Sequence, residues 1–368
     1  MRETAVRATA LFSWNGTRAT EAQDWGLMAQ ATSLPGTTDR RIAALLTLLA
    51  ENATIIISGA RMAREIGVSR STVWRWVERL RELGVRVKGQ PRNGYFLEEV
   101  PDILTPDLLR KRMKGSLFGK RLYHFFKTDS TNRVAMELGY AGEPEGAVVL
   151  AEEQTAGRGR AGRSWHSERG AGIYATLLLR PMLSPVLAPL LTMLAGLSSR
   201  AAIQAQSGLT VELKWPNDLL LSGAKLGGIL TEMHAEPNLV RFVVIGLGIN
   251  VNQQKFPPDI TGLATSLRKE SGKAHSRLEL LVRLLTQFET DYNLFLREGP
   301  SYVVDRFQRE SDFAQGKRVK VESGRETYFG ITDSLSPDGF LRVKKDDGQV
   351  VTVIAGDVTE VGINAADD

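Results

Sequence analysis

The spacing of apolar residues changes twice along this chain, and that change constrains the fold more than any other feature of the sequence. Over residues 38–100 the apolar positions recur three and four apart, as in amphipathic helices. Residues 115–311 interleave apolar strand-like runs with helical ones, which predicts a mixed sheet covered by helices. Residues 312–363 hold short alternating runs between glycine turns, which predicts a small β-barrel. We therefore expect an α+β protein of three domains.

Individual elements follow from the same patterns. In the middle domain the predicted strands are Ala147–Glu152, Tyr174–Leu179 and Phe242–Ile245, and the predicted helices are Val186–Ala205 and Leu278–Leu296. In the last domain the predicted strands are Arg318–Glu322, Glu326–Thr332, Leu341–Lys345 and Val350–Ile354. Residues 1–37 have no sustained periodicity, and we interpret them as a poorly ordered extension. A partner-binding helix and an artefact of start-codon choice are the alternatives for that segment.

Composition excludes several kinds of site. The 368 residues include no cysteine, which excludes disulfides, zinc ribbons, iron–sulfur clusters and thiol nucleophiles. The four histidines are scattered along the chain, which argues against a histidine metal site. No run approaches the ~18 apolar residues of a membrane helix, and Trp14, Asn15 and Gly16 interrupt any secretory signal. We expect a protein of the reducing cytoplasm that does not enter a membrane.

Residues 59–80 carry the pattern of a helix-turn-helix. Gly67 supplies a tight turn in which the backbone becomes left-handed, and Ser69 can cap the helix that follows. The two helices are expected to bury Met62, Ala63 and Ile66 on the first, and Val73, Val77 and Leu80 on the second. In this motif the second helix lies in the major groove of DNA.

Charge and a hairpin support the same interpretation. Over residues 60–95 there are nine arginines and lysines against three glutamates, a net charge of +6, whereas the whole chain has a net charge of +5. Such a local excess is the electrostatic footprint of phosphate binding. The stretch 84–97 alternates with a period of two and predicts the small hairpin of a winged variant. We predict a winged helix-turn-helix over residues 38–100; the alternative is a helical bundle whose arginines are merely solvated.

The segment Gln154–Trp165 is the most informative for chemistry. Between Gly157 and Gly172 the chain holds five glycines and four arginines. Glycine lets a ligand approach the backbone, and arginine offers forked donors that suit phosphate and carboxylate. RNA-binding tails have a similar composition, but this segment lies between apolar strands, which favours a small-molecule phosphate site. Its glycine content also predicts a loop that is mobile until a ligand orders it.

Four other turns in the middle domain combine glycines, amides, hydroxyls and a cation. They are Asp129-Ser130-Thr131-Asn132, Lys214-Trp215-Pro216-Asn217-Asp218, Lys225-Leu226-Gly227-Gly228-Ile229-Leu230 and Gly246-Leu247-Gly248-Ile249-Asn250-Val251-Asn252. Each of them alone is more often an ordinary turn than a site. Their joint occurrence around one predicted sheet favours a single ligand site.

Together and in this order, these motifs and the Gly157–Arg163 run resemble those of biotin protein ligases. The preceding helix-turn-helix makes the chain similar to the bifunctional form of that family, which also represses the biotin operon. The resemblance covers about residues 40–362. It implies a class II synthetase-like central domain with a mixed sheet and a C-terminal SH3-like barrel. Lipoate ligases have a related core, but their Arg-Arg-x-Ser-Gly-Gly-Gly run is absent here.

The resemblance implies an ATP-dependent biotin–[acetyl-CoA-carboxylase] ligase. In such an enzyme the biotin carboxylate attacks the α-phosphate of ATP to give biotinyl-5′-AMP and pyrophosphate. A lysine of a biotin carboxyl carrier domain then takes the biotin. Because an anion attacks a polyanion in the first step, catalysis must come from positioning and charge neutralisation.

The same resemblance assigns residues to each role. The catalytic residues are expected to be Arg158, Arg160 and Lys225. Biotin is expected to contact Ser130, Thr131, Asn132, Gln154, Arg158, Gly159, Arg160 and Lys225. ATP is expected to contact Arg160, Arg163, Lys214, Asn217, Asp218, Asn250 and Lys317, with Arg318 as the alternative to Lys317. Mg²⁺ is expected with ATP near Asp218 or Asn250. Residues 250–266 are expected to fold over adenine, and Trp165 is either a hydrophobic cover for biotin or an anchor of its loop.

The N-terminal domain is assigned in the same way. Its expected DNA contacts are Ser69, Arg70, Ser71, Thr72, Arg75 and Arg79. We expect a homodimer, promoted by ligand, on an operator with two half-sites. Two alternatives stay open: a metabolite-sensing transcription factor without ligase activity, and a ligase whose helix-turn-helix no longer binds an operator.

Overall fold

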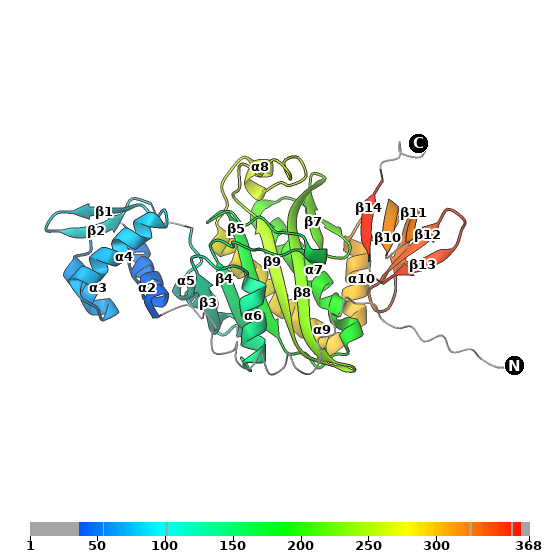
Figure 1. The fold of residues 1–368 in the computed structure, drawn as a ribbon, viewed down its shortest axis with the longest axis horizontal. Coiled ribbons are helices and arrows are strands. Elements are labelled where there is room, and N and C mark those ends of the chain that lie inside the picture. The colour runs from blue at the N-terminus through cyan, green and yellow to red at the C-terminus, as the bar shows by residue number, and fades with distance from the viewer. Residues whose placement is uncertain (1–36, 54, 100–101, 324–325, 355, 362–368) are drawn as a thin grey trace.

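Three domains follow one another along the long axis of the molecule (Figure 1). The computed structural model describes residues 37–361 except 54, 100–101, 324–325 and 355. The extension predicted over residues 1–37 thus lies outside the described residues, apart from Thr37, where the first helix begins. The domain that holds residues 39–99 lies at one end, the domain built on a seven-stranded sheet lies in the middle, and residues 316–361 lie at the other end.

The N-terminal domain has the predicted winged helix-turn-helix. Its elements are α2 (Thr37–Glu51), α3 (Gly59–Ile66), α4 (Arg70–Glu82), β1 (Val87–Gln90) and β2 (Gly94–Leu97). Gly67 has a φ of 72°, so the left-handed turn requires glycine, and the Ser69 hydroxyl accepts a hydrogen bond from the amide of Thr72 at 3.1 Å. Of the expected inner residues, Met62, Ala63, Val73, Val77 and Leu80 are buried and Ile66 is half-buried. The pattern missed Trp76, which is also buried in this core.

The central domain is a seven-stranded mixed sheet. Its spatial order is β3 (Arg121–Phe125), β4 (Ala147–Ala151), β5 (Gly172–Leu179), β9 (Leu239–Asn250), β8 (Ala224–Glu236), β7 (Asp218–Leu221) and β6 (Glu212–Lys214). Strands β3 and β4 are parallel, whereas every other neighbouring pair is antiparallel. The predicted strands at 147–152, 174–179 and 242–245 are confirmed as β4, β5 and part of β9.

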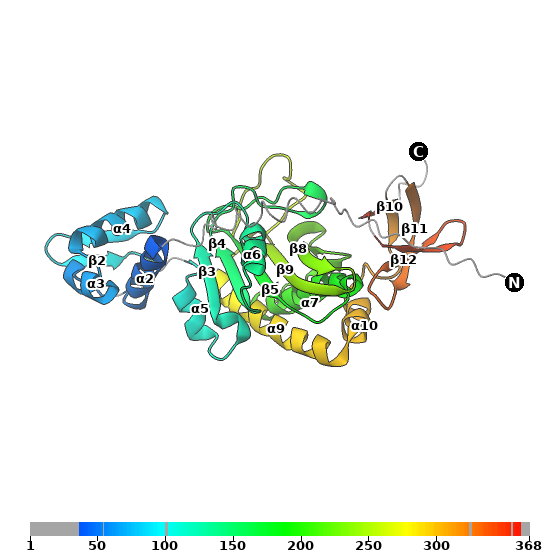
Figure 2. The same ribbon diagram turned by 60° about the horizontal axis from the view of Figure 1, so that its bottom comes forward.

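Helices cover both faces of this sheet (Figure 2). Helix α6 (Thr131–Tyr140) packs on one face, while α7 (Ala188–Ser207) and α9 (Arg277–Glu298) pack on the other. These two long helices confirm the helical predictions for residues 186–205 and 278–296. The remaining helices are α5 (Pro106–Arg112), α8 (Leu267–Ser271) and α10 (Pro300–Glu310), with short 3₁₀ turns at Leu117–Gly119, Arg160–Gly162 and Pro185–Leu187.

Helix α7 corrects one expectation from the sequence. Residues 185–207 are long and apolar enough to cross a membrane by length and composition, although the sequence was expected to hold no such run. In the structure 72% of that apolar window is buried, between the sheet and α9. The hydropathy of α7 is therefore explained by its place in the core of the domain.

The C-terminal domain is a five-stranded antiparallel sheet. Its order is β13 (Val350–Val353), β12 (Leu341–Lys345), β11 (Glu326–Leu335), β10 (Arg318–Ser323) and β14 (Asp357–Glu360). The four strands that the sequence predicted correspond to β10, β11, β12 and β13. Strand β14 was missed, and it pairs with β10 at the edge of the sheet, where it faces the central domain.

Candidate functional site

One cavity of about 470 Å³ lies where the loop of residues 154–171, called here the Gly-Arg loop, meets the central sheet and β14. The residues that the sequence assigned to biotin and ATP lie far apart in the chain, and all but one of them line this cavity. They are Ser130, Thr131, Asn132, Gln154, Arg158, Gly159, Arg160, Arg163, Lys214, Asn217, Asp218, Lys225 and Asn250. The fold thus brings five separate motifs to one site.

Bare backbone forms the floor of the cavity. A Cβ atom at Gly246 on β9 would lie 2.1 Å from Oδ1 of Asn132, and one at Gly248 would lie 2.6 Å from the Trp165 indole. On the neighbouring strand, a Cβ at Gly228 would reach Trp165 at 3.4 Å. These glycines therefore leave room above the sheet for groups that a side chain would displace.

Buried hydroxyls and amides form one part of the cavity lining. The Gln154 Oε1 atom accepts hydrogen bonds from the amide and the hydroxyl of Thr131, at 2.8 and 3.1 Å. The Asn132 Nδ2 group donates to the carbonyl of Leu230 at 3.1 Å and to Glu232 at 2.8 Å. Ser130, Thr131 and Asn132 are all buried at the start of α6. Their hydroxyls and amides are fixed, uncharged hydrogen-bonding groups, which suit a neutral polar ring.

Five cations also line the cavity, and four of them contact a protein oxygen. Arg158 lies 3.4 Å from Glu232, Arg160 donates to the carbonyl of Gly356 at 3.0 Å, Arg163 pairs with Asp357, and Lys225 lies 2.7 Å from Asp218. The fifth, Lys214, lies over the Phe313 ring. Burial lowers the pKa of Arg160, and the nearby Asp357 carboxylate opposes that shift. An arginine nevertheless stays charged in a protein, so the lining keeps its strong positive charge.

Trp165 lies between the loop and the floor. Its amide donates to the carbonyl of Gly157 at 2.8 Å, which fixes the residue within the Gly-Arg loop. Its indole packs against Gly248, and the Lys225 ammonium lies 5.9 Å from the ring centre. The indole Nε1 is buried, and no described residue gives it a hydrogen-bond partner. A buried donor of this kind fits a ligand acceptor, so the residues present suit an organic ligand at this place.

The segment after β9 covers the cavity with apolar side chains. Phe256, Ile260 and Leu263 line the cavity from this segment. Two backbone hydrogen bonds anchor the segment to Lys225, one to the carbonyl of Leu263 at 2.8 Å and one from the amide of Thr265 at 3.0 Å. This cover is the one predicted to fold over adenine, and its apolar surface suits a planar base.

The expected magnesium ligands differ in how well they fit. Asn250 is buried, its amide donates to the carbonyl of Thr265 at 3.0 Å, and its Oδ1 accepts from Gln253 at 3.2 Å. Both amide atoms are thus already bonded, and Asn250 does not fit a metal ligand. Asp218 places one carboxylate in the cavity lining. Among the described residues there is no group of three acidic or histidine side chains that could hold a metal ion. A magnesium ion here would have to be held mostly by phosphate and water.

Lys317 is the assigned ATP residue that lies elsewhere. Its ammonium pairs with Glu360 at 2.9 Å, and it is absent from the described residues that line the cavity. Arg318, the alternative, pairs with Asp346. The C-terminal domain instead contributes Glu322 and β14 to the lining, which the sequence did not indicate because β14 is only four residues long.

On the N-terminal domain, helix α4 presents the assigned DNA contacts to solvent. Arg70, Ser71, Arg75 and Arg79 are exposed, and Arg79 pairs with Glu82 at 2.7 Å. The Ser69 hydroxyl acts as the cap of α4 and lies 2.8 Å from the hydroxyls of Ser71 and Thr72. Trp74, which the sequence did not single out, is 55% exposed on the same helix.

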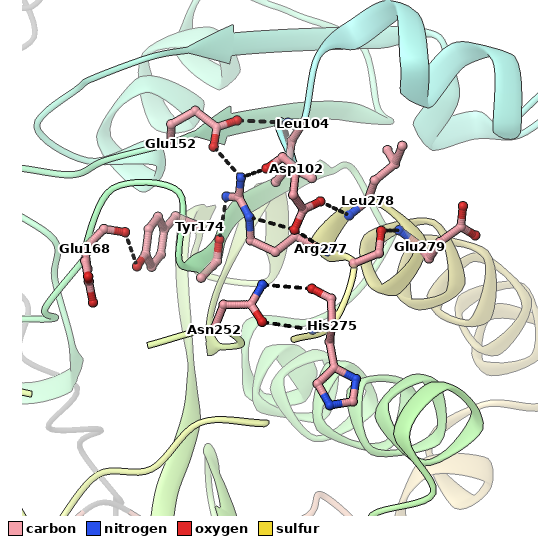
Figure 3. A network of polar contacts seen from close by, with 12 residues as sticks. Asp102, Leu104, Glu152, Glu168, Tyr174, Asn252, His275, Arg277, Leu278 and Glu279 are labelled. Carbon is pink, nitrogen blue, oxygen red and sulfur yellow. Dashed lines mark hydrogen bonds and ion pairs between the residues drawn. The ribbon is translucent and has the colours of Figure 1, made fainter. Parts of the chain in front are cut away.

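The structure also reveals a buried ionic group that sequence reasoning missed. Glu152 and Arg277 form an ion pair of 2.8 Å behind the Gly-Arg loop (Figure 3). Glu152 ends an apolar run, and a buried carboxylate always needs a partner, so the sequence did hold a signal for one half of the pair.

Fold and cavity define a ligand-binding domain with a helix-turn-helix in front. Residues 125–250 match the biotin/lipoate A/B protein ligase family, residues 41–96 match an HTH domain, and residues 315–359 match the biotin protein ligase C-terminal domain.

Individual relatives agree with these matches. The chain is 36% identical over 306 residues to the bifunctional ligase/repressor BirA of Bacillus spizizenii, and the alignment covers 83% of this chain and 94% of that protein. It is 35% identical over 271 residues to the biotin–[acetyl-CoA-carboxylase] ligase of Mycobacterium tuberculosis, 71% of this chain and 98% of that one. The biotin protein ligase from Aquifex aeolicus in complex with biotin and ATP superposes with a TM-score of 0.56 at 28% identity, over 65% of this chain and 98% of that one. The chain belongs to the biotin protein ligase family.

Proposed function

We propose that this protein is an ATP-dependent biotin protein ligase that forms biotinyl-5′-AMP, transfers biotin to a lysine of a biotin carboxyl carrier domain, and represses biotin biosynthesis genes. The observation that carries the proposal is the polarity of the cavity. The cavity is lined both by uncharged hydrogen-bonding groups, around Thr131, Asn132 and Gln154, and by the cations Arg158, Arg160, Arg163, Lys214 and Lys225. Biotin has a neutral ureido ring and a carboxylate, so this lining offers partners for both groups.

The first chemical step, the formation of biotinyl-5′-AMP, suits the cations that line the cavity. A carboxylate oxygen of biotin attacks the α-phosphorus of ATP, and the bond from that phosphorus to the bridging oxygen breaks as pyrophosphate leaves. Arg158 and Arg160 hold the carboxylate and phosphate oxygens close together, and Lys225 neutralises charge at the α-phosphate. Asp218, 2.7 Å from Lys225, holds that ammonium at the cavity wall. Such preorganised charge is the main source of catalysis when two anions react.

The second step needs protection from water. The neutral ε-amine of an acceptor lysine attacks the acyl carbon of the mixed anhydride, AMP leaves, and the nitrogen releases a proton. Until the acceptor arrives, the anhydride is stable only if water is excluded. The Gly-Arg loop and Trp165 lie over the glycine floor and are placed to exclude it. Mg²⁺ would accompany ATP, bound through phosphates and water with Asp218 nearby.

The N-terminal domain supports the repressor half of the proposal. Helix α4 exposes Arg70 and Arg75, and neither of them has an ion-pair partner among the described residues. One such module makes too few phosphate contacts for tight binding, so a homodimer on two half-sites would supply the affinity. Ligand binding would promote that dimer. A cytoplasmic location fits a protein that reads DNA and uses ATP.

Intact mass spectrometry tests the ligase. The purified protein is incubated with biotin, ATP and a carboxyl-carrier fragment, and the fragment is expected to gain the mass of one biotinyl group only when ATP is present. A protein that binds biotin but neither tags the fragment nor accumulates an acyl-adenylate would be a metabolite-sensing transcription factor. A protein that tags the fragment but selects no DNA from a random duplex pool would be a ligase without repressor function.

A further inference from the structure

The buried arginine at the start of α9 connects two ends of the Gly-Arg loop. Arg277 is fully buried, and the proposed chemistry does not use it. Its Nη1 donates to the carbonyl of Gly172 at 3.1 Å, and its Nη2 donates to Oε2 of Glu152 at 2.8 Å (Figure 3). Glu152 directly follows β4 and Gly172 begins β5, so these two residues flank the loop. The β4–β5 ladder, in which Ala151 pairs with Tyr174, already holds the two ends of the loop side by side, and one guanidinium binds both of them.

The same arginine holds the linker to the N-terminal domain. The Asp102 carboxylate accepts hydrogen bonds from the amides of Arg277 at 2.8 Å and Leu278 at 3.3 Å, and lies 3.3 Å from the Arg277 Nε. The Asp102 carbonyl also accepts from Nη2. On the other side, the amide of Leu104 donates to Oε1 of Glu152 at 2.9 Å. Figure 3 shows the linker residues Asp102 and Leu104 meeting the ion pair of Glu152 and Arg277.

Side chains of the linker alternate between two cores. Ile103 packs against the N-terminal core, and Leu104 is buried in the core of the central domain. The hydroxyl of Thr105 lies 3.0 Å from that of Thr47 on α2, in a buried contact. Phe126, which follows β3, is buried in the N-terminal core. A shift of the linker therefore moves the position of the helix-turn-helix relative to the cavity.

The buried ion pair of Glu152 and Arg277 depends on all of its hydrogen-bonding partners. Burial by itself would raise the pKa of Glu152, but Arg277 and the hydrogen bonds from His124 and Leu104 lower it well below its ordinary value. Both groups are thus charged, and a buried charge must keep its full set of partners.

We propose that Arg277 is a positioning residue that couples the Gly-Arg loop to the linker at residues 102–105, so that the occupancy of the cavity changes the position of the DNA-binding domain. The inference rests on the proposed function because biotin and ATP are taken to order the loop. The path runs from the loop residue Gly170, whose amide donates to the carbonyl of Glu152 at 2.9 Å, through Glu152 to Arg277, and from Arg277 to Asp102.

Hydrogen exchange of the full-length protein tests the coupling. In the wild type, biotin and ATP are expected to slow amide exchange at least fivefold both in the loop and at residues 102–105. Asp102→Asn removes the charge that holds Arg277 but leaves the loop contacts in place. This variant is expected to keep the protection of the loop within twofold and to lose the effect at residues 102–105. Glu279→Gln, which breaks the exposed Arg112–Glu279 pair on the same helix, is the matched control and is expected to behave like the wild type.

The possible outcomes distinguish a failure of the coupling from a failure of the proposed ligand site. If the ligands protect the loop but leave residues 102–105 unchanged in the wild type, or if Asp102→Asn still transmits the effect, the coupling is refuted. If the ligands do not protect the loop at all, the ligand site and the coupling fail together. With duplex DNA selected from a random pool by the wild type, the gain in affinity on adding biotin and ATP is expected to fall from at least fivefold to under twofold in Asp102→Asn.

A kinetic split distinguishes positioning from simple stabilisation. Arg277→Lys keeps the charge but cannot reach Glu152 and Gly172 together. The variant is expected to raise the KM for biotin in adenylate formation at least fivefold with kcat within twofold of the wild type. A fall in Tm with an unchanged KM would assign Arg277 to stability alone. If this variant does not fold, Asp102→Asn, at a partly exposed side chain, still decides the question.

Discussion

Gly246→Ala is the most direct test of the glycine floor. Gly246 lies in the middle of the sheet, on β9, where it pairs with Thr176 of β5 and Leu230 of β8. An added Cβ would lie 2.1 Å from Oδ1 of Asn132, more than 1 Å inside ordinary van der Waals contact. Because β9 is held on both sides, the backbone cannot retreat, and Asn132 must move instead.

Moving Asn132 breaks a defined set of contacts. Its Oδ1 lies 2.7 Å from the Thr176 hydroxyl, and its Nδ2 donates to the Leu230 carbonyl and to Glu232. With Asn132 displaced, a polar group of the bound ligand is left without its partner, which costs about 1–3 kcal/mol of binding free energy. At roughly 1.4 kcal/mol per tenfold change, biotin affinity is expected to fall by about 5- to 150-fold.

Calorimetric titration with biotin measures that loss, and thermal unfolding shows whether the variant is folded. Gly196→Ala on α7 is the matched control, because its Cβ would meet Ile229 and Leu213 at an ordinary 3.6 Å. Alanine in a helix interior is favoured by about 1 kcal/mol over glycine, so the control is expected to keep biotin affinity and to raise Tm. Biotin affinity within twofold of the wild type in Gly246→Ala would refute the role of the floor.

Three further predictions concern the cations, the loop and the buried pair. Arg160→Ala and Lys225→Ala are expected to reduce biotin-dependent pyrophosphate exchange at least ~100-fold, with exposed Lys120→Ala as the control; unchanged exchange would remove that residue from adenylation. Limited proteolysis within residues 157–172 is expected to slow when biotin and ATP are added, and equal cutting rates would contradict a loop that closes. Burial alone would raise the pKa of Glu152, but its ionic and hydrogen-bonding partners lower it from 4.5 to about 2. The carboxylate therefore stabilises the fold above pH 4.5, and this contribution is lost as the pH falls toward 2. In urea unfolding the stability gap between wild type and Glu152→Gln is expected to shrink from pH 7 to pH 3, and a constant gap would contradict the sign.

Local features of the fold were predictable because they depend on neighbouring residues. The turn at Gly67, the cap at Ser69 and the buried face of α4 all follow from spacing within one or two helical turns. The Gly-Arg loop was equally clear, because its composition contrasts with the apolar strands on either side. Its role as a lid for biotin and ATP stays a prediction that the experiments above address.

Long-range features were not predictable, because pairing across the chain leaves no local pattern. Strand β9 lies beside β5, so that Gly172 pairs with Asn250. The ion pair of Glu152 and Arg277 joins residues 125 positions apart. Sequence alone signals that Glu152 requires a partner but not which cation supplies it. Strand β14 is too short to show alternation, so the sequence did not indicate that this edge of the domain faces the cavity. The ATP contact of Lys317 stays a prediction.

Four cations of the cavity already have protein partners, three of them carboxylates and the fourth a backbone carbonyl. Glu232 on β8, Asp218 on β7, and Gly356 with Asp357 at β14 each hold one of them. To bind these cations, the oxygens of a substrate anion must replace the protein oxygens. An anion that binds the cations only weakly would not displace those oxygens. Each exchange also frees a group on a different part of the fold. Anion binding would therefore break contacts within the central sheet and contacts between the loop and the C-terminal domain together. The C-terminal domain would then hold the loop less tightly once the substrates are bound.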